Sequence, residues 1–225
     1  CGELLRLVPG KRAVIEGVYD GRRAVIRLFL ENEKALSRAC WQELQRVWPQ
    51  MKSGDFRVCE PLCHAPEHGI VVVCMVPGMP LLQHLWQSPP ESRAWIWQPV
   101  AEWLRRYSAG TETAARASPR EWIEKAGRAS RTQPFKDLYE VESAILTQMH
   151  RLADLIEGTE WRFAIGHGDF HPNNLIVDGR RLTGIDIGGS ARAPVYRDMA
   201  RFLMHMGRRG MVPSGARFLG VDRAG

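Results

Sequence analysis

The chain has 225 residues, of which 44% are hydrophobic and 25% charged, so it can bury a sizeable core in one domain or in two lobes. It has no apolar run of about 18 residues and no signal-peptide pattern, and we therefore expect no membrane partner. The net charge of +6 comes from basic residues scattered singly and in pairs, without a nucleic-acid-binding motif. We expect a solvated basic surface rather than a nucleic-acid partner.

The N-terminal third is predicted to be rich in strands. Five are expected, at residues 4–8, 13–19, 22–30, 57–59 and 70–76. Pro9-Gly10 and Asp20-Gly21 are turn signals between the first three strands. Residues 31–47 are predicted to be helical, because four of their residues fall on one stripe: Leu36, Cys40, Leu44 and Val47.

The five cysteines form no compact disulfide framework, and reduced thiols in a cytoplasmic protein fit this count best. Four zinc-capable side chains fall within ten residues: Cys59, Cys63, His64 and His68. Cys63 and His64 are adjacent, however, and Pro61 and Pro66 stiffen the segment. This spacing favours a loop with incidental thiols between two strands over a zinc site.

The middle of the chain is predicted to be helical at residues 91–108 and 137–157. The second helix is indicated by apolar residues at helical spacing: Leu138, Val141, Ile145, Met149 and Leu152. Trp95, Trp97 and Trp103 are expected to pack in the core or between helices rather than to form a stacking platform.

Four polar residues in the second half form a pattern with a chemical meaning. His167 and Asp169 form His-x-Asp, Asn174 follows five residues after the Asp, and Asp186 begins an Asp-x-Gly. In the catalytic loop of a kinase, an Asp deprotonates the attacking hydroxyl, and an Asn and a second Asp hold magnesium against the ATP phosphates. The spacing here fits that loop.

The residues after Asn174 are predicted to form a β-hairpin. Residues 175–177 are predicted to form a short apolar strand and residues 181–185 a second strand, with Asp178-Gly179 as a hairpin turn between them. A hairpin returns Asp186 to the end where Asn174 lies, which two ligands of one metal ion require.

The stretch A-I-G-H-G-D-F-H-P-N-N at 164–174, with I-D-I-G at 185–188, resembles the aminoglycoside phosphotransferase and choline kinase family. The resemblance implies an α+β, protein-kinase-like, two-lobed fold, with a small antiparallel β lobe that carries one helix and a mainly helical large lobe. It implies a nucleotide-binding lobe at 1–76, a hinge at 77–80 and a large lobe at 81–225 that carries the catalytic loop 167–174.

The resemblance also implies roles for individual residues. Asp169 would be the catalytic base, and Asn174 and Asp186 the magnesium ligands, with ATP and Mg²⁺ as cofactors. The partner would be a small molecule with a hydroxyl acceptor, such as an aminoglycoside, an amino alcohol or a sugar. Asp198, at the start of an apolar helix, is predicted to be an N-cap or a loop anchor rather than a catalyst.

The expected nucleotide-binding residues depart from the family pattern. Arg27, in A-V-I-R, stands where the family-type V-A-I-K has Lys, and its predicted partner is Glu43. No G-x-G-x-x-G loop exists, so the turn at Pro9-Gly10 would have to cover the phosphates. The remaining residues predicted to bind nucleotide are Lys11, Arg12, Met75 and Val76.

Two alternatives remain open. The first is a kinase-fold pseudoenzyme that acts as a nucleotide- or partner-binding module, which Arg27 and the sparse phosphate loop favour and the complete set of catalytic-loop residues opposes. The second is metal-dependent hydrolysis by His167, Asp169 and His171, which would share one face of a strand. Pro172 favours a loop instead, with His167 as a bracing hydrogen-bonding residue.

The sequence begins at Cys1 rather than Met and ends in a Gly/Arg-rich tail, which suggests a fragment or a processed product. A lipid-modified Cys1 is disfavoured, because an ATP-dependent enzyme belongs in the compartment that holds ATP. The identity of the acceptor and the oligomeric state cannot be predicted from the pattern.

Overall fold

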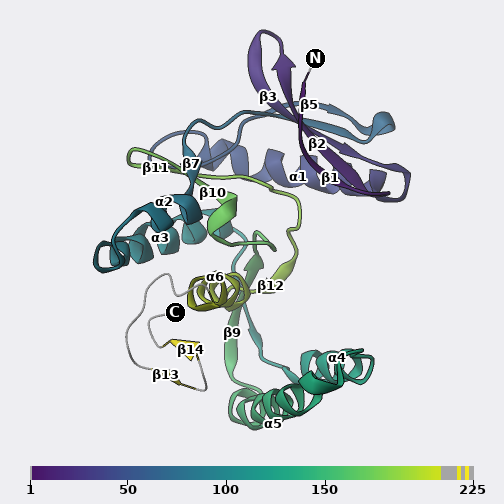
Figure 1. The fold of residues 1–225 in the computed structure, drawn as a ribbon, viewed down its shortest axis with the longest axis vertical. Helices are drawn as coiled ribbons and strands as arrows, with labels where there is room; N and C mark the ends of the chain where they lie inside the picture. The colour runs from purple at the N-terminus through teal and green to yellow at the C-terminus, as the bar shows by residue number, and fades with distance from the viewer. Residues whose placement is uncertain (1, 209–216, 219–220, 223–225) are drawn as a thin grey trace. The chain divides into compact units, whose positions relative to one another are not determined.

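The computed structural model describes residues 2–208, 217–218 and 221–222 (Figure 1). The chain divides into two compact units: Cys1–Thr111 with Ala164–Gly225, and Glu112–Phe163. Cys1 and most of the Gly/Arg-rich tail lie outside the described residues. None of the helices in the described part of the chain has the length and apolar composition that a bilayer-spanning segment needs.

The larger unit begins with a five-stranded antiparallel sheet in the order β1-β2-β3-β6-β5. Its strands are β1 (Glu3–Val8), β2 (Arg12–Tyr19), β3 (Arg22–Phe29), β5 (Pro61–Ala65) and β6 (Ile70–Cys74). The predicted turns are confirmed: Gly10 has φ +69°, and Asp20 and Gly21 have φ +49° and +73° between the paired residues Tyr19 and Arg22. Positive φ at both central residues is what a tight two-residue hairpin turn requires.

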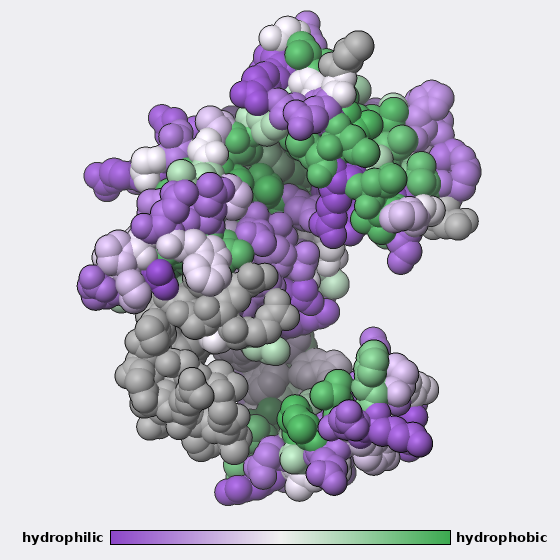
Figure 2. Space-filling model, in the orientation of Figure 1, coloured by the Kyte–Doolittle hydropathy of each residue, from purple (hydrophilic) through white to green (hydrophobic). Residues whose placement is uncertain are grey.

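Helix α1 (Lys34–Met51) follows a short 3₁₀ turn, η1 (Glu31–Glu33), and packs against the sheet. Its buried apolar residues are Cys40, Leu44, Val47 and Met51. Leu36, predicted to belong to the same stripe, is 44% exposed. On the outer part of the sheet, exposed apolar side chains gather over β1 and β2 (Figure 2): Leu4, Leu5, Leu7 and Val18.

The membership of the sheet differs from the prediction. The fifth strand is β5, which lies where a loop was expected, whereas β4 (Phe56–Val58) pairs in parallel with β11 (Arg181–Gly184) in a second sheet. Pro61 is the first residue of an edge strand, a position where a missing N–H is tolerated. The proline therefore did not exclude a strand.

The second sheet contains the hairpin that carries the motif. Its strand order is β4-β11-β10-β7, with β10 (Leu175–Asp178) and β7 (Met79–Pro80). Leu175 pairs with Gly184, and Asp178 pairs with Arg181 across the turn, so the predicted hairpin is confirmed.

Helices complete the larger unit. The α-helices are α2 (Leu81–Gln87), α3 (Trp97–Ser108) and α6 (Tyr196–Arg208). Three further 3₁₀ segments belong to the described part of this unit: η2 (Pro66–His68), η3 (Pro90–Ile96) and η5 (Pro172–Asn174). Its remaining short strands are β12 (Arg192–Pro194), β13 (Arg217–Phe218) and β14 (Val221–Asp222). Trp103 is fully buried and stacks on Tyr107 and Phe170, as predicted for a core residue. Trp95 is 44% exposed and is not a core residue.

The smaller unit consists of two helices and two strands. Its elements are β8 (Thr113–Arg116), α4 (Arg120–Arg131), η4 (Lys136–Leu138), α5 (Tyr139–Ile156) and the first four residues of β9 (Glu160–Ile165), and β8 and β9 pair in antiparallel register. The predicted helix is present in α5. Its apolar stripe is exposed, however, with Val141, Ile145 and Leu152 all more than half accessible.

Candidate active site

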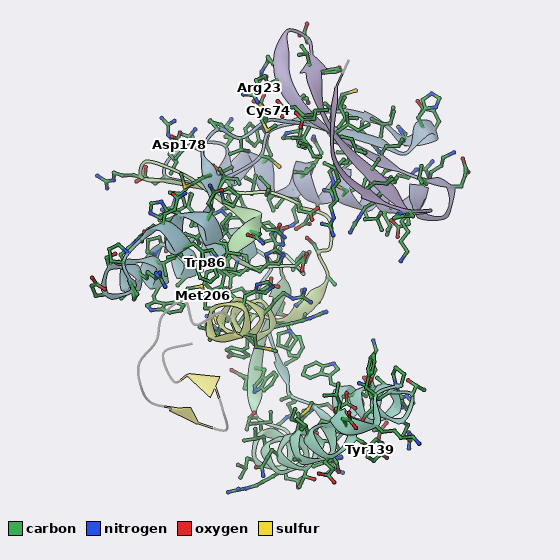
Figure 3. The ribbon with its side chains drawn as sticks, in the orientation of Figure 1. Arg23, Cys74, Trp86, Tyr139, Asp178 and Met206 are labelled. Carbon is green, nitrogen blue, oxygen red and sulfur yellow. The ribbon has the colours of Figure 1, made fainter. Side chains whose placement is uncertain are left out.

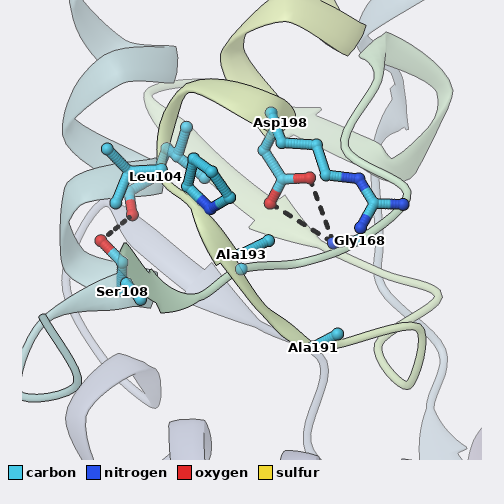
Figure 4. Close-up of a pocket in the computed structure, with 11 residues that line it drawn as sticks. Leu104, Ser108, Gly168, Ala191, Ala193 and Asp198 are labelled. Carbon is cyan, nitrogen blue, oxygen red and sulfur yellow. Dashed lines mark hydrogen bonds between the residues drawn. The ribbon is translucent and has the colours of Figure 1, made fainter. Parts of the chain in front are cut away.

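The loop that carries the His-x-Asp pattern is anchored by Asp198 of α6 (Figure 4). The Asp198 carboxylate accepts backbone N–H groups from His167 at 2.6 Å and from Gly168 at 3.1 Å. Gly168 has φ +82°, and a Cβ there would lie 2.0 Å from the carbonyl oxygen of Gly189, so only glycine fits. The prediction that Asp198 is a loop anchor is confirmed.

His167 braces the same loop from inside. Its ring is fully buried against Trp103, Tyr107 and Phe170, and its Nε2 lies 3.0 Å from the carbonyl oxygen of Ile185. Burial lowers the pKa of this imidazole below its usual 6.5, against smaller opposing effects of the Ile185 carbonyl and nearby carboxylates. His167 is therefore a neutral residue that braces the loop from the core.

This geometry separates the three residues of the hydrolase alternative. Residues 166–171 form a loop, so His167, Asp169 and His171 do not share a strand face. The His167 ring points into the core, while His171 lies beside Asp169. In the part of the chain that the structure describes, no group of three His, Cys, Asp or Glu residues is arranged to hold a metal ion.

Asp169 is accessible and paired. Its side chain is 44% exposed, and Arg201 Nη1 of α6 donates to its Oδ1 at 2.5 Å. The Nε2 atom of His171 lies 3.5 Å from its other carboxylate oxygen. Sequence reasoning missed Arg201; the available signal was its position three residues after Asp198, on the same helix face.

Asn174 and Asp186 flank the hairpin at one end. The Nδ2 amide group of Asn174 donates to the carbonyl oxygen of Asp169 at 2.9 Å, which leaves the amide oxygen as the atom suited to a cation. Asp186 has φ +57°, in the left-handed region that few non-glycine residues adopt. Asp186 lies two residues after the end of β11, and Gly188, two residues further on, has φ +136°.

Five of the residues predicted to bind nucleotide or metal line one cavity of about 280 Å³: Arg27, Met75, Val76, Asn174 and Asp186. Most of the remaining wall is formed by apolar side chains that were not predicted from the sequence: Leu5, Val14, Val25, Leu44, Val73, Ile176, Ile185 and Ile187. Arg6, Cys59 and Cys74 complete the lining. A largely apolar wall with a few convergent polar groups is typical of a small-molecule site. Lys11 and Arg12 do not line this cavity; the carbonyl oxygen of Lys11 accepts the N–H of Leu30 instead.

Arg27 pairs with Asp186, not with Glu43 as predicted. Its Nη2 lies 2.6 Å from Asp186 Oδ1, and its Nη1 donates to the carbonyl oxygen of Ile187 at 2.6 Å and to Cys40 Sγ at 3.2 Å. The physical reason is that Glu43 already has a cation three residues away on its own helix: Arg46 donates to both of its carboxylate oxygens, at 2.6 and 2.9 Å.

Glu43 instead joins α1 to α3. The Tyr107 hydroxyl donates to Glu43 Oε1 at 2.6 Å and lies 2.9 Å from Ser190 Oγ, beyond the Asp-x-Gly segment. Burial alone would raise the pKa of Glu43, but the hydrogen bonds from Arg46 and Tyr107 outweigh it and hold that pKa below its usual value. Burial, and then the neighbouring carboxylate, raise the pKa of Tyr107.

Two thiols also line the cavity, Cys59 and Cys74. Burial raises the pKa of Cys59 to about 12, which keeps it a protonated, unreactive thiol. Figure 3 shows Cys74, the last residue of β6, beside Arg23. The N–H of the next residue, Met75, donates to the carbonyl oxygen of Arg23 at 3.0 Å. This pairing holds the backbone of Met75 at the wall of the cavity.

Comparisons with known proteins identify the family and the fold of the chain. The phosphotransferase enzyme family matches residues 18–221. A thermostable mutant of aminoglycoside phosphotransferase APH(4)-Ia superposes with a TM-score of 0.62 at 16% identity, over 89% of this chain and 71% of that one. A choline/ethanolamine kinase family protein from Mesorhizobium loti gives 0.61 at 14% identity, over 91% and 64%, and a glucosamine kinase gives 0.54 at 18% identity, over 96% and 59%.

A comparison with curated protein sequences finds no significant match. The structural neighbours share the protein-kinase-like α+β fold, so the predicted fold class and the family resemblance are confirmed. Because the family matches most of its length, the chain belongs to the phosphotransferase enzyme family.

Proposed function

We propose that the protein transfers the γ-phosphoryl group of ATP to a hydroxyl of a small molecule, with Asp169 as the catalytic base and magnesium as the cofactor. The observation that carries this proposal is the cavity in which Arg27, Asn174 and Asp186 converge. Asn174 is hydrogen-bonded to the backbone of Asp169, which links the cavity wall to the base. We infer a cytoplasmic location from the need for ATP.

Asp169 would accept the proton of the acceptor hydroxyl. The acceptor oxygen then forms a bond to the γ-phosphorus as the bond between that phosphorus and the β,γ-bridging oxygen breaks, with ADP as the leaving group. Arg27 would bind phosphate oxygens and oppose the charge that develops on them. The exposed carboxylate of Asp169 leaves room for an acceptor.

The residues present fit a magnesium ion. Mg²⁺ prefers oxygen ligands and is commonly held by one or two protein groups together with substrate phosphates. Asn174 and Asp186 supply an amide oxygen and a carboxylate in the same cavity. When bound, the ion would neutralise phosphate charge and polarise the γ-phosphoryl group.

Solved structures of similar fold support nucleotide and acceptor binding in this class. Amicoumacin kinase hAmiN has been solved with AMP-PNP, Ca²⁺ and Ami, and a thermostable APH(4)-Ia mutant with ADP and hygromycin B. We therefore propose an aminoglycoside, an amino alcohol or a sugar-like molecule as the acceptor.

The substitution Asp169→Asn tests the base. It keeps the shape of the side chain but removes the proton acceptor, so turnover with an ATP–magnesium mixture and a panel of such acceptors should fall about a hundredfold or more. Nucleotide affinity should change little. Asp178→Asn, at the last residue of β10 beside the hairpin turn, is the matched control and should retain activity, because this side chain is 45% exposed.

Near-native turnover in Asp169→Asn would show that the catalytic assignment is wrong. A wild-type protein that binds ATP–magnesium but modifies no acceptor in the panel would favour the pseudoenzyme alternative. Metal content that depends on His167 and His171 rather than on Asn174 and Asp186 would favour the hydrolase.

A further inference from the structure

One face of α6 contacts three different parts of the catalytic loop. Asp198, Arg201 and His205 lie at positions i, i+3 and i+7 of this helix and therefore share a face. Asp198 holds the loop backbone, Arg201 pairs with the side chain of Asp169, and the His205 ring stacks on His171 at 4.6 Å between centroids. A single helix face thus sets the loop backbone, the base and the ring beside it.

The carboxylate of Asp169 is contacted from both sides. Arg201 donates to Oδ1 at 2.5 Å, and His171 Nε2 lies 3.5 Å from Oδ2. The N–H of Asn173 lies 3.3 Å from His171 Nδ1, and the side-chain amide nitrogen of Asn174 lies 3.3 Å from His171 Nε2, so the loop holds this ring beside Asp169. Each carboxylate oxygen has two acceptor sites. These contacts therefore restrict the rotation of Asp169 and leave it able to accept a further proton.

We propose that Arg201 is a positioning residue for the catalytic base: its guanidinium fixes the orientation of the Asp169 carboxylate towards the acceptor hydroxyl. This inference rests on the proposed role of Asp169 as the base. The Arg201 and Asp169 side chains are 42% and 44% exposed, and ion pairs at such exposure contribute little to folding. The pair should therefore affect the rate of phosphoryl transfer more than the stability of the fold.

The substitution Arg201→Gln tests this role. A base that is no longer held in its productive orientation should lower kcat by about tenfold to a hundredfold, with the KM for ATP within about twofold of wild type. Arg201→Lys should recover part of the loss, because it keeps the charge but not the planar fork. Guanidinium ion should raise kcat of Arg201→Ala and should not raise kcat of Asp169→Asn.

Arg197→Gln is the matched control, since Arg197 is exposed and lies one helical turn earlier on α6. It should retain wild-type kcat. In the double variant Arg201→Gln/Asp169→Asn, kcat should be no lower than in Asp169→Asn alone, because Arg201 acts through Asp169.

Multiplicative losses in the double variant, or an unchanged kcat in Arg201→Gln, would overturn the role of Arg201. If Asp169→Asn still lowered the turnover of the wild type in that case, the proposed function would stand without the role of Arg201. A wild-type protein without turnover on any acceptor would overturn the proposed function and this inference together.

Discussion

The guanidinium group of Arg27 binds three partners. It pairs with Asp186 and donates to the carbonyl oxygen of Ile187 and to the thiol of Cys40. A planar fork can satisfy such a set, whereas an ammonium is a compact point charge. Arginine at this position therefore fixes the segment after β11 as well as placing positive charge in the cavity.

Arg27→Ala should weaken ATP binding or turnover by about tenfold to a hundredfold, as expected when a charge-assisted hydrogen bond worth about 1.5–3 kcal/mol is lost. Arg27→Lys should preserve or raise turnover, because the ammonium can still pair with Asp186. Steady-state kinetics measures both effects. Arg23→Ala removes an exposed arginine from the same strand and should leave kinetics unchanged; an inert Arg27→Ala would contradict a role in phosphate binding.

His167 makes the fold sensitive to acid. Burial lowers its pKa below 6.5 in the folded state, so below about pH 6.5 the unfolded chain takes up a proton that the folded chain does not. The stabilisation is present above the unfolded pKa and is lost as the pH falls. The free energy of unfolding should therefore decrease by up to about 1.4 kcal/mol per pH unit from this residue.

Urea unfolding of the wild type and of His167→Gln at pH 7 and pH 5.5 measures this contribution. The variant should show a smaller loss of stability between the two pH values. Phe170→Leu, which alters the same buried cluster without removing a titrating group, should keep the wild-type loss. If the wild type and His167→Gln lost the same free energy of unfolding between pH 7 and pH 5.5, His167 would not be the source of the acid sensitivity.

At the scale of elements, the hydrogen bond between Glu43 and Tyr107 ties α1 to α3. Both side chains are buried, and Tyr107 also stacks on Trp103 and meets Ser190. The helix that follows the third strand is thus attached to the segment beyond the Asp-x-Gly motif. The contact replaces the predicted pairing of Glu43 with Arg27.

Tyr107→Phe keeps the ring and removes the hydroxyl. It should lower the free energy of unfolding by about 1.5–3 kcal/mol, the usual contribution of a hydrogen bond to a charged group. Chemical denaturation measures this change. Tyr139→Phe, at a 55% exposed site on α5, should have little effect. If the two variants were equally stable, the Glu43–Tyr107 bond would not contribute to the fold.

At the scale of the whole molecule, a ligand that binds only the folded chain stabilises it. ATP–magnesium at about a hundred times its Kd should add about 2.7 kcal/mol to the free energy of unfolding and raise Tm. Asp186→Ala should reduce this shift more than Asn174→Ala, because it removes a formal charge from the proposed metal site. Thermal melts with and without ligand test this, and an absent shift in the wild type would support the pseudoenzyme.

The local elements of the fold were largely predictable. Turns at Pro9-Gly10 and Asp20-Gly21, and the Asp178-Gly179 hairpin, depend on a few adjacent residues whose backbone preferences are strong. The proximity of Asn174 to Asp186 was predictable for the same reason, because one local hairpin joins the two residues. The spacing of the catalytic-motif residues predicted the candidate base, and the family resemblance that they carry implied the fold class and the family.

Contacts between distant segments were decided only by the tertiary structure. Residues 61–65 complete the first sheet by pairing with β6, whereas β4 (Phe56–Val58) pairs with β11 in the second sheet. Which strand each segment joins is a long-range contact that no local pattern encodes. Arg27 pairs with Asp186 because packing brings β3 against the segment after β11, while Arg46 already neutralises Glu43. Arg201 meets Asp169 across 32 residues for the same physical reason: the direction of a long charged side chain is set by the packing of its helix, not by its neighbours in sequence.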